Sequence, residues 1–578
     1  MTTRERHDLS RPLEELHPNE RLKHDSRYLR GTIAAGLDDP LTGAISDKDT
    51  PLTKFFGMYQ QDDRDLRDGR RRAKLEPRYQ FMVRMRLPGG VLTPAQWLAL
   101  DLLARENADG TLRLTSRQTF QFHRVLKRNL RRHIRGIVAA GLDTMGACGD
   151  GNRNVIATAN PLQSPIHAEV NALARQLSAH LMARTGAYRE VFLGEAPVPA
   201  DTVEEPLYGR TYLPRKFKIA LAVPPQNDID VYGHDLGLVA IVENGKLAGF
   251  DVLVGGGMGM THKVPATFPR LGDVVGFCTT ERVIAVAEQT LSIQRDYGDR
   301  KDRAHARFKY TIEDRGTEWF LAELASRLGS PLEPARPFTL TTSGDTFGWT
   351  QGADGLWHYT LFVENGRITD LGGRRLMSGM RALAAQHRGV FALTTNQNVI
   401  IAGISVAERP AIEAILSEYG IENDSGATAL RQNSISCVAL PTCGLAMAES
   451  ERYLPALTDK IDEILVAEGL ERQSISIRMS GCPNGCSRPY LAEIAFVGKA
   501  VGKYNLYLGA SANGDRLNAL YRENIGEAQI LEALRLVLHR YAKERRAGES
   551  FGDFTVRTGI VRSMDHGRDF QRELAQAR

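Results

Sequence analysis

The chain has 578 residues, of which 42% are hydrophobic and 25% charged, and its formal net charge is +5. That length is too great for one hydrophobic core, and the composition is that of a folded globular protein, which excludes a fibrous or disordered chain. The sequence contains no apolar run of about 18 residues, the length that a helix needs to span a bilayer. Residues 1–8 lack the apolar segment of a signal peptide. Six cysteines fit a reducing compartment better than a disulfide scaffold, so we expect a cytoplasmic protein without membrane contact.

Two arginine-rich runs lie in the N-terminal part of the chain, at residues 64–78 and 124–135. Runs of this kind can bind nucleic acid. Acidic residues such as Asp65 and Asp68 are interleaved with the first run, however, and no nucleic-acid motif accompanies either run. We therefore interpret both runs, Arg64 included, as solvated helix faces and predict no nucleic-acid partner.

Four basic motifs follow one another in the first half of the chain. They are Arg84 with Arg86, Arg113 with Arg117, Arg153, and Arg215 with Lys216 and Lys218. Arginine suits bidentate capture of a carboxylate or oxyanion, whereas lysine offers a point charge and can donate a proton. For a single arginine a surface salt bridge is the simpler interpretation. Four motifs in one half favour a site for anionic groups.

Two patterns recur along the chain in the same order. Residues 114–118 (Leu-Thr-Ser-Arg-Gln) return 279 positions later as residues 393–397 (Leu-Thr-Thr-Asn-Gln), each time after a glycine turn and a helical stretch. Residues 249–255 and 503–509 are also similar, and both are typical of strands that run into glycine-rich turns. The repeat predicts an α+β fold in which a small unit and a larger unit occur twice.

This repeat divides the chain into five predicted parts. They are an N-terminal extension (1–75), a first small unit (76–145), a first larger unit (146–335), a second small unit (336–425) and a second larger unit (426–578). The two larger units differ chemically, because residues 213–218 contribute cations where residues 477–482 contribute a cysteine. The first larger unit therefore offers cations at the position where the second offers a thiol.

Four of the six cysteines form two close pairs, Cys437 with Cys443 and Cys482 with Cys486. Four thiolates can hold a cubane iron–sulfur cluster, one per iron, and the Pro-Asn-Gly turn at 483–485 lets the second pair converge. A zinc site and disulfides remain alternatives, although zinc usually takes a tighter C-x2-C pair than either of these. Cys148 and Cys278 have no partner motif, and we expect them to be small buried residues.

The cysteine segments at 437–449 and 481–486 resemble those of the sirohaem–[4Fe-4S] sulfite and nitrite reductases. The likeness extends from Tyr28 to Arg557, and the Arg-x-Arg-Leu-Pro-Gly-Gly, Ser-Arg-Gln-Thr-Phe-Gln-Phe-His, Asn-Arg-Asn and Leu-Pro-Arg-Lys-Phe-Lys motifs agree in order. The resemblance implies the family's pseudo-twofold fold, with two ferredoxin-like units and two larger units around a central cofactor. Gly149 stands where some relatives have asparagine, which we interpret as a subfamily difference.

The resemblance implies six-electron reduction of sulfite to sulfide, in sulfate assimilation and cysteine biosynthesis, at one sirohaem coupled to one [4Fe-4S] cluster. The implied cluster ligands are Cys437, Cys443, Cys482 and Cys486, with Cys486 also axial to the sirohaem iron. The implied catalytic contacts to sulfite are Arg84, Arg153, Lys216 and Lys218, and the two lysines would deliver protons. The residues implied to hold sirohaem or its surroundings are Arg113, Arg117, Gln121, His123, Arg215, Lys309, Asn484 and Cys486.

The electron donor is expected to be a separate protein. Residues 255–260 (Gly-Gly-Gly-Met-Gly-Met) lack the last glycine of a dinucleotide-binding G-x-G-x-x-G sequence and favour a plain glycine-rich turn. The likeness is closest to haemoprotein (beta) subunits of bacterial assimilatory NADPH-dependent enzymes, which implies an NADPH-dependent flavoprotein (alpha) subunit as partner. The alternatives are a ferredoxin-dependent sulfite or nitrite reductase and a non-catalytic, zinc-stabilised binding protein.

Overall fold

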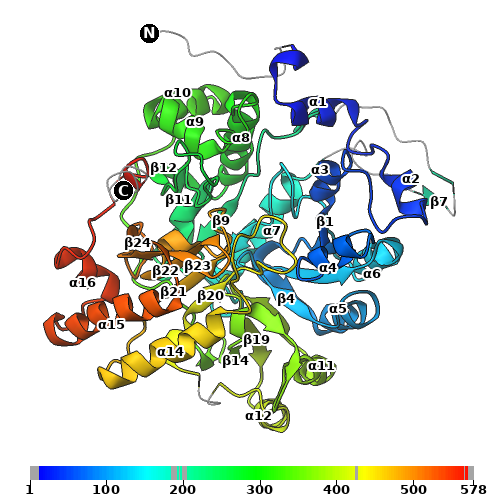
Figure 1. Ribbon diagram of the computed structural model, residues 1–578. Coiled ribbons are helices and arrows are strands. Elements are labelled where there is room, and N and C mark those ends of the chain that lie inside the picture. The colour runs from blue at the N-terminus through cyan, green and yellow to red at the C-terminus, as the bar shows by residue number, and fades with distance from the viewer. Residues whose placement is uncertain are drawn as a thin grey trace.

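The structure is a computed structural model that describes residues 12–183, 192–193, 196–197, 205–423, 427–564 and 566–570. Residues 1–8, on which the signal-peptide expectation depends, lie outside this part. None of the described helices has the length and apolar character needed to cross a membrane. Strands lie towards the middle of the molecule, and most helices lie around them (Figure 1).

Two five-stranded sheets correspond to the two predicted small units. One of them, which we call the first small sheet, has the order β1 (Met58–Asp62), β2 (Tyr79–Arg84), β5 (Phe120–Val125), β4 (Leu112–Leu114), β15 (Arg367–Ile368). The second small sheet has the order β13 (Gly348–Gln351), β14 (Trp357–Leu361), β19 (Val399–Ile404), β18 (Val390–Leu393), β3 (Val91–Leu92). The short strands β3 and β15 are exchanged, so each half of the chain supplies an edge strand to the other half's sheet.

Two further five-stranded sheets correspond to the predicted larger units. The first larger sheet has the order β12 (Asp273–Thr279), β11 (Lys246–Val254), β10 (Leu236–Glu243), β9 (Ile219–Ala222), β6 (Ile156–Ala157). The second larger sheet has the order β20 (Ser434–Ser436), β21 (Ile477–Ser480), β22 (Ile494–Ala500), β23 (Lys503–Leu508), β24 (Ala519–Ile525). Read from β6 or β20, both sheets have two parallel pairings followed by two antiparallel ones.

In each half, a glutamine at the equivalent position links a small sheet to a larger sheet. Gln118 Nε2 donates to the carbonyl of Ala157 in β6 at 2.7 Å, and Gln397 Nε2 donates to the carbonyl of Ser436 in β20 at 2.8 Å. Both glutamines have positive φ, 51° and 71°. The sequence repeat is therefore a structural duplication, and the predicted α+β fold of paired small and larger units is confirmed.

Helices cover the outer faces of these sheets. The helices of the small units and the N-terminal segment are α1 (Pro18–Asp25), α2 (Ile33–Asp38), α3 (Thr50–Thr53), α4 (Arg67–Arg72), α5 (Pro94–Asn107), α6 (Leu130–Ala139), α11 (Leu376–Gln386) and α12 (Arg409–Glu418). Those of the larger units are α7 (Pro165–His180), α8 (Val283–Tyr297), α9 (Phe308–Arg315), α10 (Thr317–Leu328), α13 (Ala429–Gln432), α14 (Leu454–Ala467), α15 (Glu527–Glu544) and α16 (Phe551–Arg557). Two small antiparallel pairs complete the described strands: β7 (Phe192–Leu193) with β8 (Ala196–Pro197), and β16 (Asp370–Leu371) with β17 (Arg374–Arg375).

Local sequence explains where these helices begin and which face they bury. At the start of α5 the Thr93 hydroxyl accepts from the Gln96 N–H at 3.2 Å, and the Gln96 side chain accepts from the Thr93 N–H at 3.0 Å, which is a capping box. In α15 the buried residues Ile530, Leu534 and Leu538 recur every four positions. Burying each such side chain stabilises the fold by about 1.5–3 kcal/mol.

Candidate active site

Parallel strands bring the cysteines together. Cys437 follows β20 directly, and Cys482 follows β21 after one glycine. Because β20 and β21 are parallel neighbours, their carboxyl ends lie at the same edge of the sheet and carry both residues there. The turn after Cys482 is closed by a hydrogen bond from the Gly485 N–H to the Cys482 carbonyl at 3.4 Å. It returns the chain towards Cys486, the one exposed cysteine of the six.

The four thiols influence one another electrostatically. Burial raises the pKa of Cys437 and Cys482 to about 12 and that of Cys443 to about 11, and Cys486 adds to all three shifts. All six cysteines are free thiols, so none of these pairs is a disulfide. Gathering thiols in a buried place makes their ionisation costly, and a bound metal centre removes that cost. The donor set therefore fits a thiolate-ligated cluster.

Close packing around the thiols requires glycine. A Cβ on Gly481 would lie 2.6 Å from the Ala439 Cβ and 2.7 Å from the Ala448 carbonyl oxygen. The Gly481 N–H donates to the Cys437 sulfur at 3.2 Å, and Asn484 Nδ2 donates to the Cys482 sulfur at 3.4 Å. Such donors stabilise a thiolate ligand. Among the described residues, no three His, Cys, Asp or Glu side chains are placed to hold one metal ion.

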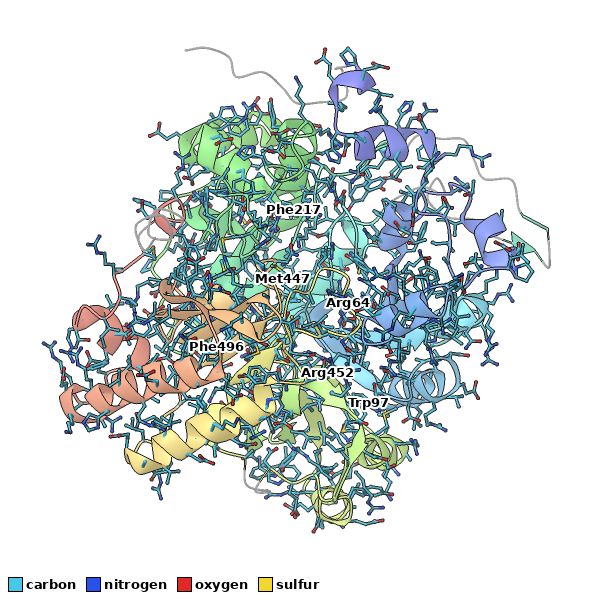
Figure 2. The ribbon with its side chains drawn as sticks, viewed as in Figure 1. Arg64, Trp97, Phe217, Met447, Arg452 and Phe496 are labelled. Atoms are coloured by element: carbon cyan, nitrogen blue, oxygen red, sulfur yellow. The ribbon has the colours of Figure 1, made fainter. Side chains whose placement is uncertain are left out.

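The N-terminal segment holds the loop of the first cysteine pair. Arg64 Nη1 donates to the carbonyls of Cys443 and Ala446 at 3.2 and 2.5 Å, and the Arg64 N–H donates to the Pro441 carbonyl at 3.1 Å. Figure 2 labels Arg64 and Met447, which belong to the two segments that meet here. The interpretation of Arg64 as part of a solvated helix face is wrong: it lies before α4, and only the tertiary fold brings it to this loop.

The second cluster of functional side chains is cationic. The parallel bridge between Asn152 and Phe217 aligns two segments, and the Arg153 N–H donates to the Phe217 carbonyl at 2.8 Å. Phe217, labelled in Figure 2, is fully buried, whereas Lys216 and Lys218 on either side of it are partly exposed. This alternation places both lysines on the same side of an extended segment, as expected for positions i and i+2. The segment precedes β9, which begins at Ile219.

The Nζ atoms of Lys216 and Lys218 form no hydrogen bond or ion pair with any residue that the structure describes, although the Asp235 carboxylate acts to raise the pKa of Lys218. Burial lowers the pKa of Lys216 well below its usual value, as do Arg307, Arg215 and Arg153, while Cys486 acts in the opposite direction. Burial and Lys216 likewise lower the pKa of Lys218. The cations therefore lie close enough to the Cys486 thiol to interact with it electrostatically, and an anion placed there would raise the pKa of both lysines.

Residues of the first small sheet border the same site. Arg84 ends β2, and its Nη1 donates to the Cys148 sulfur at 3.0 Å. Gln121 and His123 are two residues apart on β5 and so point to the same face of the sheet. Their side chains share a hydrogen bond of 3.1 Å. Burial lowers the pKa of His123 well below its usual value, which favours the neutral form of its imidazole. Cys148 is buried, as the sequence suggests, but it is also the partner of a predicted substrate contact.

The other predicted cofactor contacts have protein partners of their own. Arg113 donates to Glu451 and to the Ser436 carbonyl, both at 2.9 Å. Lys309 Nζ donates to the carbonyls of Gly257, Gly259 and Phe268. These bonds fix the two side chains, and their contact with sirohaem remains a prediction.

Arg117 is less completely satisfied. One of its terminal nitrogens lies 3.4 Å from His234 Nδ1, and the other donates to the Asn154 carbonyl and to the Ile219 carbonyl, the latter at 3.3 Å. Its Nε has no partner in the described part of the chain. Burial lowers its pKa to about 9, and Arg153 and Arg488 add to that shift. A buried guanidinium with an unused donor suits a carboxylate ligand.

Several acidic residues that order these cations were not identified from the sequence. Asp235 accepts from Arg307 Nη2 and from the Lys218 N–H, both at 3.0 Å. Asp150 pairs with Arg303, and Asp230 pairs with Arg478. No local motif marks them, because each partner lies far along the chain.

Comparison with known proteins identifies the family of this chain. Residues 73–139 and 350–419 match the nitrite/sulfite reductase ferredoxin-like half domain, and residues 174–332 match the nitrite and sulphite reductase 4Fe-4S domain. The sulfite reductase [NADPH] hemoprotein beta-component of Chromohalobacter salexigens is 59% identical over 96% of this chain and 98% of that protein. The protein of the same name from Geobacillus kaustophilus is 56% identical over 95% and 97%.

A solved structure shares the fold. The NirA protein of Mycobacterium tuberculosis superposes with a TM-score of 0.75 at 23% identity, covering 94% of this chain and 97% of that one. The duplicated sheets, the paired family-model matches and the near full-length relatives all agree. The chain belongs to the nitrite and sulphite reductase family.

Proposed function

We propose that this chain is the haemoprotein component of an NADPH-dependent sulfite reductase and catalyses the six-electron reduction of sulfite to sulfide. The observation that carries the proposal is the meeting of two chemically different groups at Cys486. Lys216 and Lys218, which form no ion pair with any described residue, come from the first half, and four free thiols come from the second. An anion-reducing centre needs both, whereas a zinc-stabilised binding protein needs no cations beside its thiols.

The chain holds one sirohaem and one [4Fe-4S] cluster. Cys437, Cys443, Cys482 and Cys486 would hold the cluster, and Cys486 would also hold sirohaem. The residues that we assign to sirohaem and its surroundings are Arg113, Arg117, Gln121, His123, Arg215, Lys309 and Asn484. When bound, these two groups supply electrons to the sulfur of the substrate, and a shared thiolate would leave almost no gap between them.

The cationic side chains bind sulfite and provide protons. Arg84 and Arg153 remain charged and would hold the sulfite oxygens through charge-assisted hydrogen bonds. Lys216 and Lys218 have lowered pKa values, so their Nζ protons are released more readily than those of ordinary lysines. Each oxygen that leaves sulfite as water requires protons, and a positioned general acid typically contributes about 10²–10⁴-fold in rate.

The electron donor is the NADPH-dependent flavoprotein (alpha) subunit. The names of the relatives, which include NADPH and a beta-component, support this partner. The glycines at 255–257 support it as well, because a Cβ on Gly256 would lie 2.2 Å from the Tyr232 carbonyl oxygen. That close packing explains the glycines without a nucleotide. We further propose a cytoplasmic location and the domain division at 75/76, 145/146, 335/336 and 425/426, in which β1 of the N-terminal extension joins the first small sheet.

The purified holoprotein tests this function directly. It should be coloured, contain iron and acid-labile sulfide, and oxidise reduced methyl viologen when sulfite is added. NADPH should replace the dye only after the flavoprotein is added. A colourless protein without labile sulfide would contradict the cofactors. Turnover with reduced ferredoxin and none with the flavoprotein would instead favour the ferredoxin-dependent alternative.

A further inference from the structure

Asp150 connects the N-terminal helix α1 to the cationic site. Its side chain is almost fully buried and accepts two hydrogen bonds from Arg303, at 2.8 and 3.0 Å. Lys23 Nζ, from α1, lies 3.1 Å from the same carboxylate. Arg215 Nη1 lies 3.7 Å away on the other side. One carboxylate is thus shared by three cations from three distant parts of the chain.

The backbone around Asp150 is bonded to the segment that carries the lysines. The Leu213 N–H donates to the Asp150 carbonyl, and the Phe217 N–H donates to the Gly151 carbonyl, both at 3.1 Å. With the bond from the Arg153 N–H to Phe217, these interactions bind residues 150–153 to residues 213–217. Asp150 therefore lies at the start of the pairing that places Arg153 beside Lys216.

Helix α1 is fixed to the same segment. Lys23 Nζ also donates to Glu20 Oε1 at 2.6 Å and to the Leu213 carbonyl at 3.0 Å. Arg300 pairs with Glu20 and donates to the Tyr212 carbonyl at 2.6 Å. In Figure 1, α1 lies at the edge of the molecule, yet its Lys23 and Glu20 side chains are buried. Buried charges of this kind are costly unless each is paired, so the network holds α1 in one place.

Charge explains why the carboxylate is needed. Burial alone would raise the pKa of Asp150, but Lys23, Arg303 and Arg215 hold it well below its usual range. Burial and Arg303 lower the pKa of Arg215 to about 10, and Asp150 opposes them. Without this anion, three cations would repel one another beside Lys216.

We propose that Asp150 is a positioning residue for the anion site, and that Lys23 makes this site depend on α1. The inference rests on the proposed function, in which Arg153, Arg215 and Lys216 face the substrate and cofactor. Removing the carboxylate charge would change the affinity for sulfite in two opposite ways. A more positive site would bind sulfite more tightly, whereas loss of the fixed Arg215 and of the 150–153 loop would bind it more weakly. A positioning role predicts the second result.

The experiment measures sulfite binding to the oxidised holoprotein through its absorption spectrum. Asp150→Asn keeps the shape of the side chain and removes its charge, and it should raise the Kd for sulfite by about tenfold or more, the effect of losing one charge-assisted hydrogen bond. Lys23→Met should act in the same direction, and Lys23→Arg should restore most of the affinity. Amide hydrogen exchange of residues 150–153 should become faster in both weakened variants.

The matched control is Asp101→Asn in α5. Asp101 is equally buried and is held by two arginines, Arg105 at 2.9 Å and Arg381 at 2.8 Å, so its loss tests the general cost of a broken buried ion pair. Sulfite affinity should be unchanged in this variant. Unchanged or tighter binding in Asp150→Asn would overturn the proposal. If Asp150→Asn does not accumulate, Lys23→Met decides by the same criterion. A wild-type protein whose spectrum does not respond to sulfite would instead refute the proposed function.

Discussion

Asp230 and Arg488 occupy corresponding positions in the two halves and form an ion pair with each other. Both have left-handed backbone conformations, with φ of 52° and 54°, directly before the short 3-10 helices Val231–Gly233 and Pro489–Leu491. Arg488 Nε donates to Asp230 Oδ2, and Arg478 Nη1 donates to the same oxygen at 2.6 Å. Arg488 lies two residues after Cys486, so the pair ties the cysteine loop to the cationic half.

Removing this buried pair should destabilise the fold. Asp230→Asn leaves Arg478 and Arg488 without their carboxylate, and breaking a buried ion pair typically costs about 3–5 kcal/mol. Urea denaturation of the holoprotein measures the loss in the free energy of unfolding. Asp553→Asn is the control, because its pair with Arg516 is half exposed and should contribute less than about 1 kcal/mol. Equal losses in the two variants would show that the buried pair contributes no more stability than the half-exposed pair.

The cluster assignment predicts a clear difference among the six cysteines. Serine at Cys437, Cys443, Cys482 or Cys486 removes a thiolate ligand, and each variant should lose iron and labile sulfide. Cys486→Ser should change the haem spectrum most. Cys148→Ser and Cys278→Ser should keep the iron and sulfide content of the wild type. A full cluster in any of the first four variants would remove that residue from the ligand set.

The cations should separate into substrate and cofactor contacts. Lys216→Ala and Lys218→Ala should keep sirohaem but lose about 10²–10³ in sulfite turnover, because each removes a donor to a developing anion. Arg117→Ala should bind sirohaem poorly. Haem content is measured first, and turnover then follows with reduced methyl viologen so that partner docking plays no part. Full haem with undiminished turnover in the lysine variants would exclude both lysines from catalysis.

Arg64 should protect the cluster from loss. Arg64→Ala removes two hydrogen bonds to the carbonyls of Cys443 and Ala446, which should let the loop move and expose the cluster. We expect faster release of iron to a chelator, by severalfold, with little change in initial cluster content. Arg71→Ala, on the exposed face of α4, is the control. Identical release rates in both variants would assign Arg64 no part in holding the loop.

Glu451 should make stability depend on acid pH. Burial alone would raise its pKa, but Arg367 and Arg113 lower it to about 2. Since the unfolded side chain has a pKa of about 4.3, the stabilisation is complete above that value and is lost as the pH falls towards 2. Glu451→Gln should therefore be less stable at pH 7 by about 3 kcal/mol and lose less stability on acidification. Parallel pH profiles for the two proteins would contradict this linkage.

Local sequence patterns were enough to identify most of the candidate site residues and the duplicated order of the fold. The spacing of Cys437, Cys443, Cys482 and Cys486, the turn at 483–485 and the four basic motifs are readable because neighbours along the chain create them. The repeat of residues 114–118 at 393–397 identified the duplication for the same reason. These patterns also gave the order of small and larger units, since each unit is built mainly from consecutive elements.

Only the tertiary structure decided which charges remain available. Arg113 and Lys309 are engaged by partners that the sequence does not reveal, whereas Lys216 and Lys218 are left without a counter-ion among the described residues. Asp230 and Arg488 are 258 positions apart, and no periodicity links residues at such a distance. The exchange of β3 and β15 and the contact of Arg64 with the cysteine loop arise in the same way. Pairing of buried charges is a property of the assembled fold, because its energy depends on which distant segments exclude water together.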